Sequence, residues 1–237
     1  MTSTDGAPTT FLELVKRRTS HRGGYRKDMD VPDEAIRFIL EAARWAPSAG
    51  NSQPWEFLVV RDAKVRQAIV DLAKKQLKEK IEMEWVTRRT RRVGSDSGFV
   101  HAPVFILVLG DPRSIEAYPV RTRLDKWQSH YYSSLSNAVL TLVLAATSLG
   151  LGSQWLSDVA SPYFTTMLKA MLGVPDPLQV YHLIPIGYVD RSLRPNPRRP
   201  LDDQVHYERY DIAKFRTDEQ VRDSLASMGI RSPNYRW

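Results

Sequence analysis

Cysteine is absent from the 237 residues of the chain. Its absence excludes disulfide frameworks, thiolate metal ligands and cysteine nucleophiles, and no metal site is expected. A long apolar run is missing as well, because the most apolar stretch, residues 138–152, falls short of the roughly 20 residues that span a bilayer. Residues 1–8 lack the basic and apolar regions of a secretory signal, so a cytoplasmic protein is expected.

Acidic residues are also scarce, since 27 Asp and Glu stand against 34 Lys and Arg and leave a net charge of +7. Such an excess is compatible with a nucleic-acid partner or with a smaller anion. With 42% apolar residues, the chain is long enough to bury a substantial core. No repeat or long linker divides residues 1–237, which favours a single domain.

Hydrophobic periodicity and turn residues predict the order of the elements. Helices are expected over residues 10–18 (from a Thr10 capping box), 32–45, 63–84, 131–149 and 161–172, and strands over 56–61, 103–110 and 182–189. Segment 191–200 holds three prolines and four arginines and is expected to be an extended arm. The tail, 202–237, has too few apolar residues for a core of its own.

The expected helix over 131–149 is apolar, and no Asp, Glu, Lys or Arg lies between Lys126 and Asp158. We therefore expect protein on nearly all sides of it. Either the core of a large monomer or a second subunit would supply that cover.

An alternating motif, Arg18-Thr19-Ser20-His21-Arg22, follows the first helix. In an extended backbone, the side chains of Arg18, Ser20 and Arg22 share one face. Two guanidinium groups beside a hydroxyl suit a phosphate or the polar edge of a heterocycle, and a solvated basic turn is the alternative. His21 points to the other face and is expected to be a surface histidine.

Two further segments are rich in small residues. Residues 46–55 (APSAGNSQPW) join a helix to a strand, and loops of this kind lie against ligands because Gly and Ala permit close approach. A structural turn around a buried Trp55 is the alternative. Residues 150–158 (GLGSQWLSD) leave the apolar helix through a glycine stop, and their spacing alone is a weak signal.

Together these segments resemble the FMN-dependent nitroreductase family in order, spacing and residue type. The resemblance extends over nearly the whole chain and rests on RxSxR at 18–22, PSAGNSQPW at 47–55, FVHAPVFILV at 99–108, GLGSQWLSD at 150–158 and IGYVD…PRRPLDDQVHYERYD over 186–211.

The resemblance implies an α+β fold with a central, mostly antiparallel sheet surrounded by helices. It also implies an intertwined homodimer with two FMN sites at the interface. The chain would be one nitroreductase-like domain, with a core over 10–200 and a C-terminal extension over 201–237 that embraces the partner subunit.

The resemblance also assigns the FMN contacts. The cofactor-binding residues carried over are Arg18, Thr19, Ser20 and Arg22 from the alternating motif; Pro47, Ser48, Ala49 and Asn51 from the loop of the other subunit; Leu156, Ser157 and Asp158; and Arg198, which reaches the phosphate. An N–H near Ser157 would face flavin N5, the atom that exchanges hydride.

Two positions depart from the family pattern. Asn196 stands where many relatives carry a lysine, so one phosphate cation is missing there. Asp158 lies where relatives often place glycine. A carboxylate directed at N5 would disfavour the reduced, anionic flavin, whereas one directed away would have no effect.

The function that the resemblance implies is oxidoreduction by a ping-pong mechanism. NADH or NADPH would pass a hydride to FMN, and a small aromatic acceptor such as a nitroaromatic or a quinone would receive it, with no side chain acting as general acid. The alternatives are a dehydrogenase, oxidase or dehalogenase of the same fold acting on a biosynthetic or catabolic intermediate and, more distantly, a basic nucleic-acid-binding protein. The oxidoreductase function implies neither a nucleic-acid nor a membrane partner.

Residues 118–127 and 85–92 are candidates for the substrate wall, in connections suited to a lid over the site. The second holds Arg88, Arg89, Arg91 and Arg92. These arginines recognise either a nucleotide phosphate or an acidic substrate, or form a solvated helix end.

Overall fold

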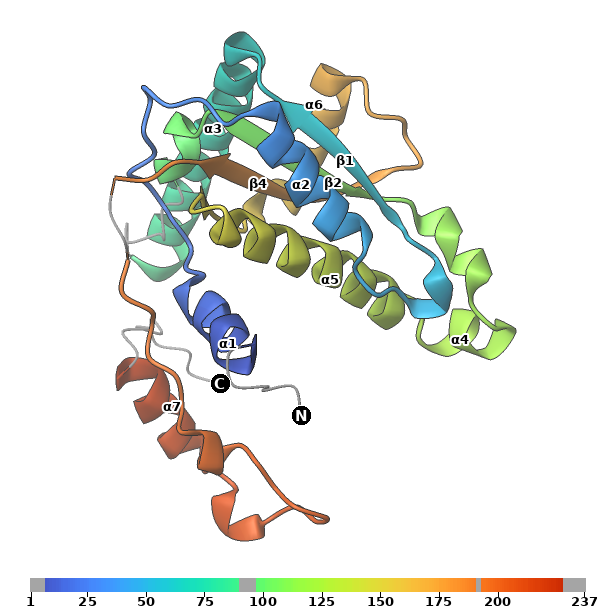
Figure 1. Cartoon of the computed structure of the whole chain (residues 1–237), viewed down its shortest axis with the longest axis vertical. Helices are drawn as coiled ribbons and strands as arrows, with labels where there is room; N and C mark the ends of the chain where they lie inside the picture. The colour runs from blue at the N-terminus through green and yellow to red at the C-terminus, as the bar shows by residue number, and fades with distance from the viewer. Residues whose placement is uncertain (1–6, 90–96, 191–192, 228–237) are drawn as a thin grey trace. The chain divides into compact units, whose positions relative to one another are not determined.

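The computed structural model describes residues 7–89, 97–190 and 193–227 (Figure 1). Contacts within the chain define two units, Met1–Leu193 and Arg194–Trp237. The first unit holds the sheet and the helices that cover it, and the second holds the short helices of the C-terminal tail.

Within the described residues, four strands form one antiparallel sheet in the order β1-β2-β4-β3. The strands are β1 (Trp55–Val60), β2 (Val104–Gly110), β3 (Gly152–Ser153) and β4 (Gln179–Gly187). At one end of the sheet, Gly110 faces Trp55 on one side and Gln179 on the other. At the opposite end, Ser153 faces Ile186. An antiparallel sheet among helices confirms the predicted α+β class.

The sheet is flanked by helices from both halves of the first unit. The α-helices are α1 (Ala7–Arg17), α2 (Asp33–Arg44), α3 (Ala63–Arg88), α4 (Val120–Asp125), α5 (Trp127–Ser148) and α6 (Pro162–Leu172), with α7 (Asp218–Ser227) in the second unit. Short 3-10 helices lie between them: η1 (Ala49–Asn51), η2 (Ser97–His101), η3 (Pro112–Ala117), η4 (Asp158–Ala160), η5 (Leu201–Asp203) and η6 (Ile212–Lys214).

Strand β2 separates two hydrophobic cores. Side chains of a strand alternate between its faces, so Val104 and Ile106 join one core while Phe105 and Leu107 join the other. The first core is completed by α2 and α5, which run along one face of the sheet (Figure 1). The second is completed by α3 and α6. The molecule is therefore layered as helix, sheet and helix.

The predicted helices and strands are all present, and the differences lie at their ends. Helix α1 already begins at Ala7, so the prediction of a Thr10 capping box is wrong and Thr10 lies inside the helix. Helix α3 continues past Glu84 to Arg88, because Lys, Glu and Arg are good helix formers whatever their charge pattern. It ends at Arg89, which adopts a left-handed conformation with φ 54°.

Within the described residues of one chain, helix α5 keeps an exposed face, so the core of this chain alone does not supply all of the cover that was expected for it. The face that packs on the sheet and on α2 is buried, whereas Tyr132, Leu140 and Leu149 are exposed. An apolar helix face exposed on a folded unit is typical of a surface that another element covers.

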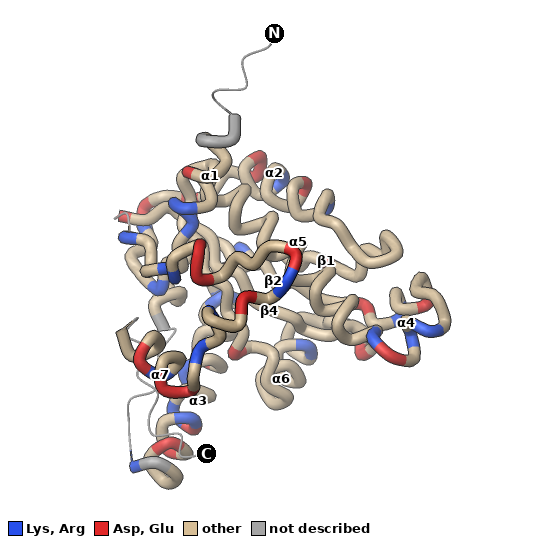
Figure 2. The backbone as a smooth tube through the Cα atoms, turned by 90° about the horizontal axis from the view of Figure 1, so that it is seen from below, with Lys and Arg blue, Asp and Glu red and all other residues tan. Residues whose placement is uncertain are grey.

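The second unit has no buried residue among those described, 194–227, which agrees with the prediction that the tail lacks a core of its own. Charges of both signs alternate along the first unit, and Figure 2 shows Lys and Arg interspersed with Asp and Glu along α3 and around α4. None of the helices in the described ranges has both the length and the apolarity that a membrane span requires.

Candidate functional site

The alternating motif forms an extra edge beside the shortest strand. Ser20 makes a parallel bridge to Ser153, and the His21 N–H donates to the Ser153 carbonyl over 2.9 Å. The approach requires a glycine at position 152, because an added Cβ would collide with Val189 and lie 3.1 Å from the His21 ring. The backbone is thus paired as an edge at Ser20, whereas the Arg18 N–H still donates to the Leu14 carbonyl as in a helix, and the shared face of Arg18, Ser20 and Arg22 stays a prediction.

His21 is buried, with 9% of its surface exposed, so the prediction of a surface histidine is wrong. Its ring Nε2 lies 3.2 Å from Thr19 Oγ1, and its carbonyl accepts a 2.9 Å hydrogen bond from the hydroxyl of Tyr25. Burial raises the pKa of Tyr25, which keeps that hydroxyl protonated as a donor. Through these contacts, buried His21 holds the motif against the rest of the protein. The residue type alone does not predict this role.

The arginine side chains of the motif differ in their surroundings. Arg18 and Ser20 are half-buried, and Arg22 is exposed. In the part of the chain that the structure describes, the Arg18 side chain makes no hydrogen bond or ion pair, and the buried Gln154 Oε1 has no partner. Buried polar atoms are normally satisfied, so these groups are suited to bind a polar, anionic ligand.

The segment after Gln154 leaves the sheet at Leu156. Leu156 exchanges two backbone hydrogen bonds with Leu183, of 3.0 and 3.2 Å, and Ser157 then turns away into η4. Ser157 is exposed, and among the described residues its N–H finds no acceptor. That N–H is therefore available to a ligand. Asp158 is directed to α3, where its carboxylate lies 2.9 Å from Lys80 Nζ.

The loop that joins α2 to β1 is rigid and packs on the first half of α5. The Ala49 N–H donates to Ser134 Oγ over 3.1 Å, and Asn137 Nδ2 donates to the Pro47 carbonyl over 3.0 Å. Ser48 Oγ accepts from a backbone N–H inside the loop. Asn51 has a left-handed φ of 51° and an exposed side chain. Trp55, which follows the loop, is buried, as the structural alternative predicted.

Within one chain the two groups of predicted site residues lie at opposite ends of the sheet. The loop leads into Trp55, which is paired through Gly110 to the Gln179 end of β4. The alternating motif bridges Ser153, which is paired to Ile186 near the other end. Seven residues of strand place the two ends roughly 23 Å apart. Figure 1 shows the segment after α1 on the left and the loop after α2 on the right.

Arg198 belongs to the second unit, where its guanidinium Nη1 donates to the carbonyls of Asn196 and Pro197 over 2.9 and 3.1 Å. These bonds are made to main-chain oxygens close in sequence, so they set the shape of the arm. The adjacent Arg199 donates to the Asp203 carbonyl over 3.0 Å.

The candidate lid segments differ in structure. Residues 118–127 run through α4, and Tyr118 is buried, with its hydroxyl 3.4 Å from Ser52 Oγ. Trp85 lies in the last turn of α3 rather than in a connection, which corrects that part of the prediction. The Arg89 guanidinium lies 6.0 Å from the centre of the Trp85 ring, and Arg91 and Arg92 lie outside the described residues.

A half-buried histidine was missed in the sequence interpretation. His182, in β4, lies against the rings of Tyr181 and Trp155, with centroid distances of 4.0 and 5.4 Å. Burial lowers its pKa to about 4, partly opposed by a hydrogen bond that the imidazole donates to the Leu156 backbone, and among the described residues its Nδ1 has no partner. No signal in the sequence marks it, because a lone His in a strand is equally compatible with either face.

Comparison with known proteins assigns the family. The model of the nitroreductase family matches residues 15–188. The chain belongs to the nitroreductase family. It is 30% identical over 212 residues to a protein of Archaeoglobus fulgidus provisionally named NADH dehydrogenase/NAD(P)H nitroreductase, covering 90% of this chain and 97% of that relative. The resemblance found in the sequence is thereby confirmed.

Solved structures of the family superpose on this chain. Oxidised iodotyrosine deiodinase, bound to FMN and 3-iodo-L-tyrosine, is similar with a TM-score of 0.65 and 26% identity, over 84% of this chain and 100% of that one. An FMN-dependent nitroreductase of Clostridium difficile is similar with a TM-score of 0.62 and 26% identity, over 84% and 99% of the two chains. The nitroreductase-like fold is thereby confirmed.

The low pKa of His182 predicts a loss of stability in mild acid. An unfolded histidine binds its proton near pH 6.5, whereas the folded one does so only near pH 4. The free energy of unfolding contributed by this group is therefore complete above pH 6.5 and falls toward pH 4, by at most about 1.4 kcal/mol per pH unit. Urea unfolding of the wild type and of His182→Phe, between pH 7.5 and 4.5, measures it. Equal pH slopes in the two proteins would contradict the prediction.

Proposed function

We propose that the protein is an FMN-dependent oxidoreductase that takes hydride from NADH or NADPH and reduces small aromatic acceptors, such as nitroaromatics or quinones, in a ping-pong cycle. The supporting observation is the edge that Ser20 forms beside Ser153, at the start of the segment that carries the available Ser157 N–H. Family membership and the FMN named in the similar structures support it further. A cytoplasmic location stays a prediction of the sequence.

The side chains of the motif fit FMN in kind. Arg18 and Arg22 supply cationic donors for a phosphate dianion, and Ser20 supplies a hydroxyl that both donates and accepts. The Ser157 N–H would donate to the flavin edge, and the buried Gln154 Oε1 would accept from a polar group of the cofactor. FMN, when bound, would supply hydride exchange at N5, and the residues contribute binding and orientation. Arg198 would add a phosphate contact from the C-terminal arm.

The arrangement in one chain favours a homodimer. The loop with Pro47, Ser48, Ala49 and Asn51 lies at the end of the sheet opposite to Arg18, so one copy cannot place both groups on one flavin. A second copy would bring its loop to the first copy's motif. Exposed apolar side chains on the layer of α1, α2 and α5 would be covered in the same step: Phe11, Leu12, Phe38, Trp45 and Leu140. The extension over 201–237 would then embrace the partner.

Reductive dehalogenation is the second candidate. It is favoured by the similarity to iodotyrosine deiodinase, at 26% identity over 84% of this chain. The same flavin site would serve both reactions, since the acceptor that enters after the nicotinamide leaves decides the outcome.

Purified protein is expected to be yellow and to release FMN on denaturation. Under anaerobic conditions, NADH or NADPH should be oxidised when a nitroaromatic or a quinone is added, and release of iodide from 3-iodo-L-tyrosine would identify the second candidate instead. A colourless protein that also fails to take up added FMN would contradict the proposed function.

Removal of a phosphate donor should weaken FMN binding. Arg18→Ala is expected to lower the binding free energy by about 1.5–3 kcal/mol, roughly ten- to hundredfold in Kd, because a charge-assisted bond is lost. Arg198→Ala should fall in the same range. Titration of apoprotein with FMN, followed by flavin fluorescence, measures both. Arg17→Ala, at the exposed end of α1, is the matched control and should bind FMN as the wild type does.

Light scattering is expected to return about twice the chain mass of 27.1 kDa. Leu140→Lys, which puts a charge on the exposed stripe of α5, should give monomers that retain FMN poorly, because burial of an unpaired charge is costly. Met167→Lys is the matched control, since Met167 is exposed to a similar degree (42% against 47%) but lies on α6, across the sheet. A wild-type protein that is monomeric and binds FMN would contradict the proposed homodimer.

A further inference from the structure

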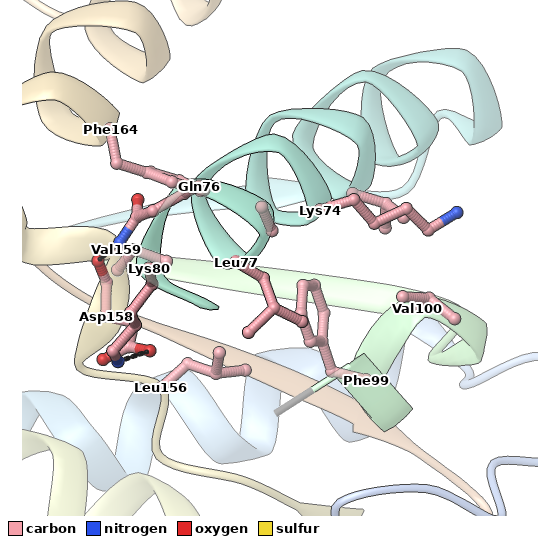
Figure 3. A pocket seen from close by; sticks show the side chains of 12 residues that line it. Lys74, Gln76, Leu77, Lys80, Phe99, Val100, Leu156, Asp158, Val159 and Phe164 are labelled. Carbon is pink, nitrogen blue, oxygen red and sulfur yellow. Dashed lines mark hydrogen bonds and ion pairs between the residues drawn. The ribbon is translucent and has the colours of Figure 1, made fainter. Parts of the chain in front are cut away.

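Helix α3 holds the segment that carries the Ser157 N–H through two side chains. Gln76 Nε2 donates to the Asp158 carbonyl over 3.1 Å, and Gln76 Oε1 accepts from the Ser161 hydroxyl over 3.1 Å. Lys80, one turn further along α3, donates to Asp158 Oδ2 over 2.9 Å. Figure 3 shows both side chains reaching from α3 toward Asp158. Gln76 therefore spans η4 from its first residue to the residue after its last.

Apolar packing does not fix this segment completely. A small cavity of about 40 Å³ lies between α3 and the segment, among the side chains of Leu77, Phe99, Leu156, Val159 and Phe164. Side chains that border a cavity lack part of the contacts that would resist a shift. The polar bonds of Gln76 and Lys80 therefore add to the apolar packing of Leu156 and Val159 in holding η4 at its distance from α3.

The ion pair with Lys80 also determines where the Asp158 carboxylate lies. Asp158 follows directly on Ser157, so its carboxylate belongs to the residue next to the available N–H. Lys80 pairs with it on the α3 side, and the two side chains are 41% and 45% exposed. An exposed pair stabilises the fold little, so its main effect is on the local potential.

We propose that Gln76 and Lys80 are positioning residues that fix the backbone of 157–158 against the flavin, and that Lys80 neutralises Asp158 so that the bound flavin is not made harder to reduce. The inference rests on the proposed FMN site. It answers the question that the sequence left open, because Lys80 holds the Asp158 carboxylate toward α3, and without this lysine the unpaired carboxylate would be free to turn toward the flavin. The replacement of a small residue by Asp158 is thus compensated by a lysine 78 positions earlier in the chain.

The test is the midpoint potential of the bound flavin. In Lys80→Met, which keeps the aliphatic stem, the unpaired carboxylate should weaken binding of reduced FMN about threefold to tenfold relative to oxidised FMN. Tenfold corresponds to a potential lower by about 30 mV for a two-electron couple. Asp158→Asn should shift the potential upward, the double variant should return close to the wild type, and Lys80→Arg should retain the wild-type value.

Lys75→Met is the matched control. Lys75 lies on the same helix and also donates to a side chain, the Tyr163 hydroxyl at 2.9 Å, but it does not touch residues 156–158. Its removal should leave the potential unchanged. In the apoprotein, Gln76→Leu should speed hydrogen exchange of the amides of residues 157–161, whereas Lys75→Met should not.

The outcomes separate the two proposals. Failure of the wild type to take up FMN would overturn the proposed function and this inference with it. FMN uptake with the same potential in wild type, Lys80→Met and Lys75→Met, or unchanged amide exchange in Gln76→Leu, would overturn this inference and leave the proposed function intact.

Discussion

Burial of β2 on both faces is the constraint on which the rest of the first unit depends. Every residue from Val104 to Gly110 is buried, so helices must cover both sides of the sheet. Because β2 also pairs along both edges, it fixes the register of β1 and β4 and thereby the places where loops leave the sheet. The Ser20 bridge to Ser153 exists only because β4 has already positioned β3.

The same sheet explains why the proposed site belongs to two copies of the chain. Antiparallel strands deliver the loop before Trp55 and the motif at Ser20 to opposite ends, and no local rearrangement of a rigid, buried sheet brings them together. Leu140 and its exposed neighbours on α5 lie between these ends. A dimer across that helix would therefore bury apolar surface and complete both sites in one step.

The net positive charge of the chain does not by itself indicate a nucleic-acid partner, because several of its cations are engaged within the protein. Lys80 is engaged with Asp158, Arg199 donates to a main-chain carbonyl, and Arg18 has no partner among the described residues. Arg18 is half-buried and makes no ion pair in the described part of the chain, and a cation in that setting suits a small anionic ligand better than an extended polyanion. Redox chemistry without cysteine then requires a bound cofactor.

The sequence by itself predicted the longer helices and three of the four described strands, because hydrophobic period is a local signal that needs no long-range contact, and its motifs, 18–22 and 46–55 among them, carried the resemblance that implied the family and the α+β class. The tertiary structure decided the burial of His21, the low pKa of His182 and the partner of Asp158, since each depends on residues brought close only by the folded sheet. It also decided that the two halves of the proposed site lie apart in one chain, because strand direction, which composition and spacing leave open, sets where each loop emerges.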